Sequence, residues 1–210
     1  MTRLFTYVIP EDWGFAPNPF FGVLTLNCCK PQVRQQAEAG DWIAANTGAD
    51  FPGGRGLLVY AAKITAKMTM REYDAWTGEY RPEKRPQPRS RSYERRAGDS
   101  LYNFDIDPPT RRAGFHHPDD MPRDLSGVYT LLSDRFVYFG RIPADIPDHL
   151  RPIIHAGQAH KSNLNAPYVE HFEEWITSHF LLNKIYGMPA KAPTFQEVEF
   201  GSKPQTGEKR

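Results

Sequence analysis

The sequence is poor in three features that quickly classify a protein: cysteine, net charge and long apolar runs. Its 210 residues include only two cysteines, Cys28 and Cys29, which are adjacent. Neighbouring cysteines rarely bridge each other, so a disulfide framework is excluded and a reducing compartment is indicated. We expect both to be buried strand residues, with a two-thiol metal or redox site as the alternative.

The charge and hydropathy patterns exclude two further classes. No apolar run approaches the length that spans a bilayer, and the N-terminus lacks the basic and apolar stretches of a signal peptide. The formal net charge is only +1, so a polyanionic partner has to be argued from local charge. We therefore expect a soluble, cytoplasmic protein with no membrane partner.

The composition that is present is globular. Hydrophobic residues make up 40% and charged residues 24% of the chain, which is typical of a folded domain and not of a disordered one. The length favours one domain. We place it at residues 1–190 and expect a disordered tail at residues 191–210.

The local patterns predict an α+β fold. A capping box formed by Thr69 and Glu72 indicates a helix from Met70 to about Trp76. Prolines in the first turn indicate two more helices, at residues 31–40 and 167–186. The clearest predicted strands are Leu4–Ile9, residues 23–28, residues 41–45 and residues 57–65, the last two forming a hairpin. We expect a single compact domain with a curved mixed sheet, or a small barrel, flanked by about three helices.

A basic insert interrupts these patterns at about residues 78–98. Its centre, "RPEKRPQPRSRSYERR", holds seven basic and two acidic residues and three prolines, a local charge of +5. Such a composition predicts an extended, solvated and mobile loop. Arginines interleaved with serine, proline and tyrosine are also typical of a segment that follows a phosphate backbone. The candidates for that contact are Arg85, Arg89, Arg91, Arg95 and Arg96.

Several segments in order resemble a known family. They are "GFAPNPFFGVLTLNCCKPQVRQQAEAGDWIAANTG", "LLVYAAKITAKMTMREYDAW", "AGDSLY", "SDRFVYFG" and "GQAHKSNLNAPYVEHFEEWI", which span Gly14 to Ile176. They are similar to the nucleotide modification associated domain family, type two, of phages and bacteria. The chain departs from the family pattern at "SLYNFDIDPPTRRAG" and in the basic insert.

The resemblance implies a link to systems that make or read modified DNA bases, in a bacterium or an infected host cell. The early "GDWI" followed by a long strand also resembles the PUA, EVE and YTH superfamily. Those domains are curved barrels that bind nucleic acid and sometimes enclose one modified base. The resemblance therefore implies a PUA-like barrel and a nucleic-acid or nucleotide partner, such as modified DNA.

Aromatic residues gather where such a fold has its pocket. Phe15 and Trp42 are candidates to stack on a flipped or single-stranded base, which contributes on the order of 1–3 kcal/mol per base. Asn18 and Asp41 are candidates to read the edge of the base. Ordinary core packing is the alternative for every one of these rings.

A second candidate site is the polar stretch before the last predicted helix. His160, Lys161, Ser162 and Asn163 combine basic, hydroxyl and amide groups at a helix start, where an anion can bind. The same residue types also serve as simple helix and turn caps. Ser162 beside His160 is a weak indication of covalent catalysis, because no nucleophile elbow surrounds the serine.

No metal site is predicted. His116 and His117, followed by Asp119 and Asp120, have the residue types of metal ligands. Adjacent histidines usually point apart, however, and turn-forming residues surround them. We interpret this stretch as a solvated loop.

Three functions follow from these patterns. The leading hypothesis is a non-enzymatic binding module that reads a modified base, without a cofactor. The second is a transferase-like enzyme acting on a modified nucleotide or base, with His160 as general base and Glu170 or Asp41 assisting. The third is a structural partner in a modification complex, and the oligomeric state is left open.

Overall fold

A six-stranded mixed sheet forms the centre of the computed structural model, which describes residues 1–157 and 159–192. The strand order is β10-β1-β3-β4-β9-β11. β1 runs parallel to β3, and β11 runs parallel to β9, whereas the other neighbours are antiparallel. In chain order the strands are β1 (Leu4–Ile9), β3 (Trp42–Thr47), β4 (Leu58–Lys63), β9 (Arg135–Tyr138), β10 (His160–Lys161) and β11 (Lys184–Ile185).

Two smaller sheets lie to one side of the central sheet. The first has the order β2-β8-β5 and is antiparallel throughout. The second is a two-stranded pair, β6 with β7. The strands are β2 (Leu24–Leu26), β5 (Ala66–Thr69), β6 (Tyr102–Asn103), β7 (Thr110–Arg111) and β8 (Tyr129–Ser133).

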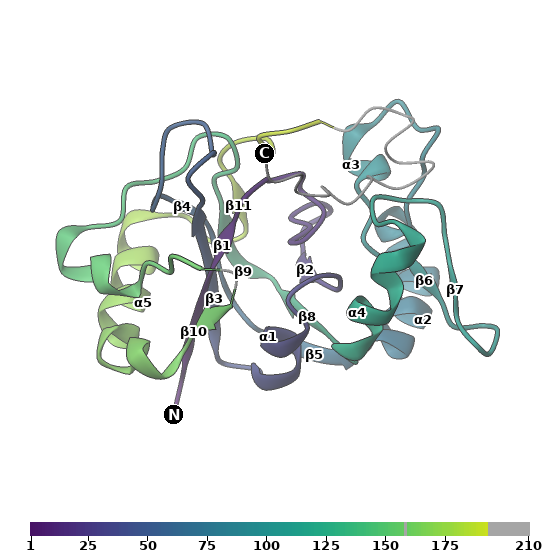
Figure 1. Cartoon of the computed structure of the whole chain (residues 1–210), viewed down its shortest axis with the longest axis horizontal. Helices are drawn as coiled ribbons and strands as arrows, with labels where there is room; N and C mark the ends of the chain where they lie inside the picture. The colour runs from purple at the N-terminus through teal and green to yellow at the C-terminus, as the bar shows by residue number, and fades with distance from the viewer. Residues whose placement is uncertain (158, 193–210) are drawn as a thin grey trace, which may run out of the picture.

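The helices lie on both sides of the central sheet. In Figure 1, α5 is on one side, and α1, α2, α3 and α4 are on the other. The α-helices are α1 (Pro31–Gln36), α2 (Met70–Tyr80), α3 (Tyr93–Arg96), α4 (Met121–Ser126) and α5 (Val169–His179). The 3-10 helices are η1 (Pro82–Lys84), η2 (Pro118–Asp120), η3 (Asp148–Ile153) and η4 (Asn163–Tyr168).

Strand alternation divides the core into two layers. Successive side chains of a strand point to opposite faces of a sheet. On β1, Phe5 and Tyr7 face the layer that also contains α1, β2 and β8. Leu4 of β1 and Trp42 of β3 face the other layer, beneath α5 and η3. Both faces of the sheet are therefore buried.

Most of the predicted elements are present. β1 and the β3–β4 hairpin lie where the sequence predicts them, and α2 begins with the predicted capping box, in which Thr69 and Glu72 exchange hydrogen bonds. The α+β fold class is confirmed. In the described part of the chain neither larger sheet closes into a barrel, so the barrel alternative is wrong.

Several boundaries differ from the sequence-based ones. α1 ends at Gln36 instead of Gly40, and the last helix begins as the 3-10 helix η4 before α5 and ends at His179. β2 ends at Leu26, so Cys28 and Cys29 lie beyond the strand that was expected to contain them. Most of the predicted tail, residues 193–210, lies outside the described residues.

The basic insert at residues 78–98 also differs from the extended loop that its composition predicts. It contains the end of α2, η1 and α3. Lys84 is fully buried, and its ammonium donates to the Asn18 side-chain oxygen at 2.7 Å and to the Val23 carbonyl at 2.7 Å. This buried lysine ties the segment to the chain that leads into β2.

Candidate functional site

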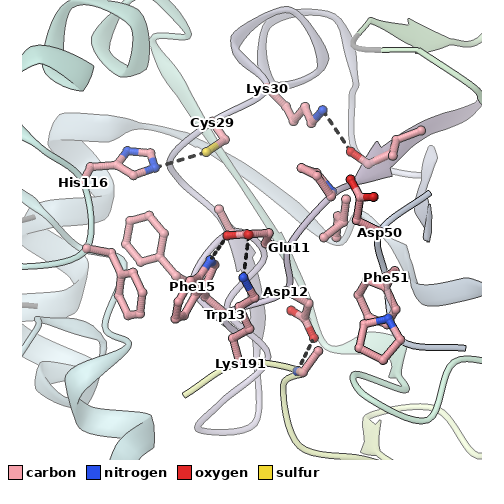
Figure 2. Close-up of a pocket in the computed structure, with 17 residues that line it drawn as sticks. Glu11, Asp12, Trp13, Phe15, Cys29, Lys30, Asp50, Phe51, His116 and Lys191 are labelled. Carbon is pink, nitrogen blue, oxygen red and sulfur yellow. Dashed lines mark hydrogen bonds and ion pairs between the residues drawn. The ribbon is translucent and has the colours of Figure 1, made fainter. Parts of the chain in front are cut away.

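A cavity of about 630 Å³ opens at the end of β1. Its walls come from the loop after β1, the β3–β4 turn, the residues just before α1, the loop before η2, and residues 190–191. In Figure 2 the Cys29 sulfur points toward His116, the Lys30 ammonium toward a backbone carbonyl and Trp13 toward Glu11, and all of these residues line the cavity. The cavity is in the size range of small-molecule sites.

Cys29 lies at a sharp turn between β2 and α1. Its φ is 59°, a value that is uncommon for a residue with a side chain and that surrounding contacts must hold in place. The Cys29 backbone N–H donates to Asp124 Oδ1 at 2.8 Å, and its carbonyl accepts a bond from Arg34 Nε at 2.8 Å. The backbone at the thiol is therefore fixed from both sides.

Arg34 connects this turn to the elements behind it. The side chain is fully buried, and its guanidinium also donates to the carbonyls of Asp124 and Tyr129, at 2.5 and 2.6 Å. A Cβ atom at Gly127 would lie 2.3 Å from Arg34 Nη2. Only glycine leaves room for the guanidinium at that position.

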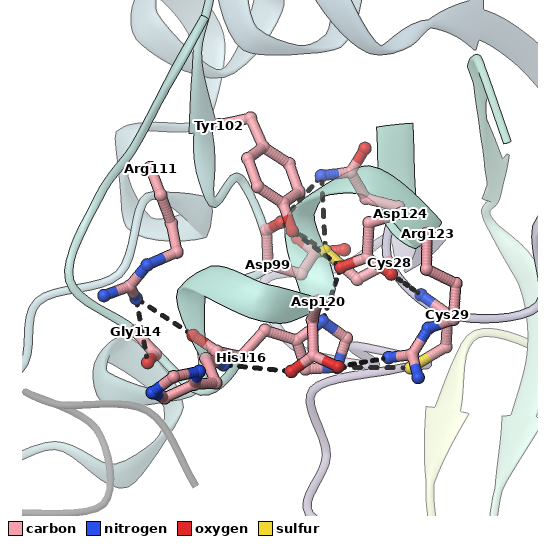
Figure 3. A network of polar contacts seen from close by, with 12 residues as sticks. Cys28, Cys29, Asp99, Tyr102, Arg111, Gly114, His116, Asp120, Arg123 and Asp124 are labelled. Atoms are coloured by element: carbon pink, nitrogen blue, oxygen red, sulfur yellow. Dashed lines mark hydrogen bonds and ion pairs between the residues drawn. The ribbon is translucent and has the colours of Figure 1, made fainter. Parts of the chain in front are cut away.

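The Cys29 thiol, His116 and Asp124 form a line of hydrogen-bonded side chains (Figure 3). Cys29 Sγ lies 3.2 Å from His116 Nε2, and His116 Nδ1 is bonded to Asp124 Oδ2. The Tyr102 hydroxyl also donates to Asp124 Oδ2, at 2.7 Å. A nucleophile, a base and a residue that orients the base are the parts of a catalytic triad.

The electrostatics of this line favour a charged histidine. Burial lowers the pKa of His116, but the Cys29 sulfur and the Asp124 carboxylate outweigh burial and raise it to about 10. Burial raises the pKa of Asp124, but the contacts with His116 more than offset it and leave that pKa below its usual value. A charged His116 places an acidic N–H beside the Cys29 sulfur, the position from which a leaving group can be protonated.

Aromatic rings make the wall next to the thiol. The Phe15 ring meets the His116 ring edge-on at 4.8 Å between centroids and stacks on Phe115 at 5.3 Å. Trp13 lies 5.6 Å from Phe115. These rings shield His116 from water on one side and give the cavity an apolar surface beside the reactive sulfur.

A metal site is the alternative use of these residues. Cys28, His116 and Asp124 each offer one possible ligand atom, and these atoms lie within 4.8 Å of one another. Cys28 is fully buried, however, so an ion held there would have no open position toward the cavity. Both Asp124 oxygens already accept hydrogen bonds. His116 and Asp124 therefore fit the orientation of the Cys29 thiol better than they fit a metal site with Cys28.

The residues expected to form an aromatic pocket are not brought together. Phe15 lines the cavity, but Trp42 is fully buried on the other face of the sheet. Its ring packs edge-on against Phe172 at 5.6 Å, and its Nε1 donates to Glu173.

Asn18 and Asp41 have partners within the protein. Asn18 is buried, donates to the Ala97 carbonyl at 2.7 Å and accepts the Lys84 ammonium. Asp41 is buried and binds both the backbone N–H and the guanidinium of Arg3, at 2.8 and 2.6 Å. Neither residue lines the cavity.

The polar stretch around His160 forms the edge strand β10 and the start of η4. His160 pairs opposite Tyr7 of β1, and the Lys161 ammonium donates to the Pro152 carbonyl at 2.8 Å. The Ser162 side chain makes no capping bond, and Asn163 is exposed. Glu170 is exposed in the first turn of α5 and has no bond to His160 among the described residues.

The arginines of the insert are spread over several environments. Arg85 pairs with Asp74 at 3.1 Å, and the Arg96 guanidinium lies over the Tyr93 ring at 5.9 Å. Arg89, Arg91 and Arg95 are exposed. The insert is joined to the cavity rim, because the Tyr93 hydroxyl donates to the Trp13 carbonyl.

Sequence reasoning missed the three residues of the line. Cys29 was interpreted as a buried strand residue and His116 as part of a solvated loop, whereas His116 is 9% exposed and Asp124 fully buried. The available signal was a cysteine two residues before the proline that opens a helix, as Cys29 stands before Pro31 of α1. Nothing in the sequence links that cysteine to a histidine 87 residues away.

Within the described residues, no helix combines the length and the apolar character needed to cross a membrane.

The comparisons with known proteins place the chain in a family. A search of curated proteins and of solved structures found no match. A family model described as nucleotide modification associated domain 2 matches residues 1–196, so the chain belongs to that family.

Proposed function

We propose that this member of the nucleotide modification associated domain 2 family is an enzyme that uses Cys29 as a nucleophile on a nucleotide or on a base within it. The observation that carries the proposal is the line from the Cys29 sulfur through His116 to Asp124, 3.2 Å at its first step, at the wall of a cavity. The family supplies the coarse context of nucleotide modification.

The chemistry proposed for this line is a two-step group transfer. The Cys29 thiolate attacks an electrophilic carbon of the substrate, a C–S bond forms, and the leaving group departs with the proton of His116 Nε2. The acceptor then attacks the same carbon and gives its proton to His116, and the C–S bond breaks. The thiolate and the imidazolium are restored, so the cycle needs no redox partner.

The cavity suits a nucleotide base. Its volume of about 630 Å³ is ample for one nucleotide. The Trp13, Phe15 and Phe115 rings give it an apolar wall next to the sulfur, and aromatic rings are common contacts of an unstacked base. Phe15 keeps the ligand-contacting role that the sequence suggested for it.

The proposal favours the enzyme over the non-enzymatic reader. A protein that only binds a modified base needs a cavity with aromatic rings and hydrogen-bonding groups. It does not need a thiol oriented by a histidine and a carboxylate. The general base also changes: His116 replaces His160, because His116 is the histidine bonded to both a nucleophile and a carboxylate.

The test begins with thiol reactivity. The native protein is treated with iodoacetamide across a range of pH, and alkylation at each cysteine is followed by peptide mass spectrometry. We expect Cys29 to react and Cys28 to stay protected. His116→Gln is expected to slow the reaction at Cys29 roughly tenfold or more at pH 7, because it removes the imidazole that lies 3.2 Å from the sulfur.

Intact-mass measurement then looks for the covalent intermediate. The protein is incubated with unmodified and 5-substituted pyrimidine deoxynucleotides and quenched in acid. An added mass that is absent in Cys29→Ser and kept in Cys28→Ala supports the enzyme. A Cys29 that reacts like a free thiol, together with nucleotide binding that is the same in Cys29→Ser, would return the protein to the reader class.

A further inference from the structure

Two lysines, Lys30 and Lys191, line the cavity, and they differ in whether a carboxylate of the described residues pairs with them. Lys191 forms an ion pair with Glu11, and its ammonium lies over the Trp13 ring at 5.2 Å. Lys30 forms no ion pair within the described part of the chain. Its ammonium donates one hydrogen bond, to the Val8 carbonyl at 3.2 Å (Figure 2). It also lies 4.7 Å from the centre of the Tyr7 ring.

An ammonium has three donors, so Lys30 keeps two that no side chain of the described residues takes. Burial lowers the pKa of Lys30, as is usual for an ammonium held away from water without a carboxylate. Leaving such a charge partly buried costs free energy unless an anion compensates for it. Glu11 and Asp12 also line the cavity, but both carboxylates already have partners. Glu11 pairs with Lys191, and Asp12 accepts a hydrogen bond from the Tyr138 hydroxyl at 2.6 Å.

Two histidines, His160 and His155, lie near Lys30. His160 lies opposite Tyr7 in the β1–β10 pair, and residues directly opposite on neighbouring strands share a face. The His160 side chain is thus on the face where Lys30 covers Tyr7. Burial lowers the pKa of His160, and the charge of Lys30 lowers it further, as expected for neighbouring cationic groups.

His155 adds an unused hydrogen-bonding group. Its Nε2 is a buried nitrogen with no hydrogen-bond partner in the described ranges. Burial lowers the pKa of His155, and Lys161 and Lys30 lower it further. The His155 backbone N–H donates to Asn46 Oδ1 at 3.0 Å, and Asn46 pairs opposite Val8, whose carbonyl accepts the Lys30 ammonium. This geometry places His155 and His160 near Lys30, and we call Lys30, His155 and His160 the basic corner.

We infer that this basic corner binds a phosphate group of the substrate, with Lys30 as its principal contact. The inference rests on the proposed function, and it narrows the substrate from any nucleoside or base to a phosphorylated nucleotide. Lys30 follows Cys29 directly in the chain, so a phosphate at Lys30 and a base at the aromatic wall place the reacting part of one nucleotide near the sulfur.

The phosphate has two possible sources with the same chemistry. It is either the 5′-phosphate of a free nucleotide or a phosphodiester of a DNA strand. Both are anions that an ammonium and imidazole N–H groups recognise. The experiment has to separate the two sources as well as test the site.

Calorimetric titration in the Cys29→Ser background measures binding without turnover. The probes are the four deoxynucleoside 5′-monophosphates, the four matching nucleosides, and short single-stranded oligonucleotides without a terminal phosphate. We expect at least one monophosphate to bind about tenfold or more tightly than its nucleoside, because the phosphate adds charge-assisted hydrogen bonds. Lys30→Gln should remove that difference and His160→Gln should reduce it.

Lys191→Gln is the matched control, since Lys191 lines the same cavity but is already paired with Glu11. It is expected to leave the preference for monophosphates unchanged. Lys30-dependent binding of the oligonucleotides alone would assign the corner to a strand phosphate, which still supports the inference. Circular dichroism of each variant confirms that the fold is intact.

The inference is overturned if nucleosides bind as tightly as monophosphates, if Lys191→Gln has the same effect as Lys30→Gln, or if no phosphorylated probe binds. The alkylation of Cys29 is measured independently of phosphate binding, so the two proposals can fail separately. A reactive Cys29 without phosphate preference retains the catalytic proposal alone. Lys30-dependent phosphate binding with an unreactive Cys29 retains the phosphate corner and removes the catalysis.

Discussion

The face of the central sheet under α5 and the face toward Cys29 are both rich in aromatic rings, but they differ in how their polar groups are partnered. Under α5, Trp42 packs against Phe172 and its indole N–H donates to Glu173 at 3.2 Å. Glu173 in turn pairs with Lys63. The indole N–H, the carboxylate and the ammonium of that group therefore all have partners among the described residues.

The cavity face holds groups that the protein itself leaves available. Lys30 has donors without partners in the described part of the chain, and the Cys29 sulfur faces a cavity. The comparison teaches that aromatic content does not by itself make a site. A site is marked by reactive or charged groups that the fold positions and leaves without a full set of partners.

The largest expected effect is on the closed face. Trp42→Ala removes a fully buried ring and is expected to lower the free energy of unfolding by about 3–5 kcal/mol, measured by urea denaturation. Trp13→Ala, in which part of the lost ring faces the cavity, should cost less, about 1–2 kcal/mol. If Trp42→Ala spared stability but abolished nucleotide selectivity, the sequence-based assignment of Trp42 to a pocket would be correct.

The next effect is a pH dependence on the cavity face. The pKa of His116 is raised from 6.5 to about 10 in the folded protein. Its contribution to stability is therefore complete below about pH 6.5 and is lost as the pH rises through about 10. We expect a loss of a few kcal/mol over that range, measured by denaturation at a series of pH values.

His116→Gln is the control for this pH dependence and should flatten the alkaline slope. Asp124 contributes in the opposite direction, because its pKa is depressed and its stabilisation is lost as the pH falls. An unchanged alkaline slope in His116→Gln would mean that the histidine is neutral in the folded protein, and the imidazolium in the proposed cycle would have to be abandoned.

A smaller effect is expected at the edge of the closed face. Glu173→Gln weakens the bonds to Trp42 and Lys63, and should cost about 1 kcal/mol because the carboxylate is partly exposed. Glu174→Gln, at an exposed neighbouring position of α5, should change stability by less than about 0.5 kcal/mol. Equal losses in the two variants would show that the Trp42 contact adds nothing.

The smallest effect concerns Asp50, an exposed carboxylate that lines the cavity. Its negative charge opposes a phosphate at Lys30, so Asp50→Asn should tighten the binding of deoxynucleoside monophosphates about twofold and leave nucleoside binding unchanged. Titration calorimetry in Cys29→Ser measures both. Asp145→Asn, an exposed change outside the cavity, is the control, and weaker monophosphate binding in Asp50→Asn would contradict the phosphate corner.

The sequence predicted the elements whose signals are local. β1 is bounded by Pro10, and α2 begins at a capping box that four consecutive residues define. Both signals depend on the intrinsic geometry of a few neighbouring residues, so they survive folding. The boundary of α1 was missed because its last turn is decided by packing, and propensity is only a weak guide there.

The basic insert was misjudged for a related reason. Its composition indicates a solvated loop, yet Lys84 is fully buried among carbonyl and side-chain oxygens of the segment before β2. Those acceptors are more than fifty residues earlier in the chain, with a separation of 61 residues for Val23. Composition describes the average of a segment and cannot identify the one residue that a distant group will bind.

By itself the sequence determined the α+β class, the resemblance to the family and the strands and helix caps, because these depend on side-chain periodicity and on neighbours in the chain. Only the tertiary structure decided the candidate site. Cys29, His116 and Asp124 come from three separate segments, and the Cys29 to His116 contact spans 87 residues. Their alignment arises from long-range packing around Arg34 and Tyr102, which no local pattern encodes.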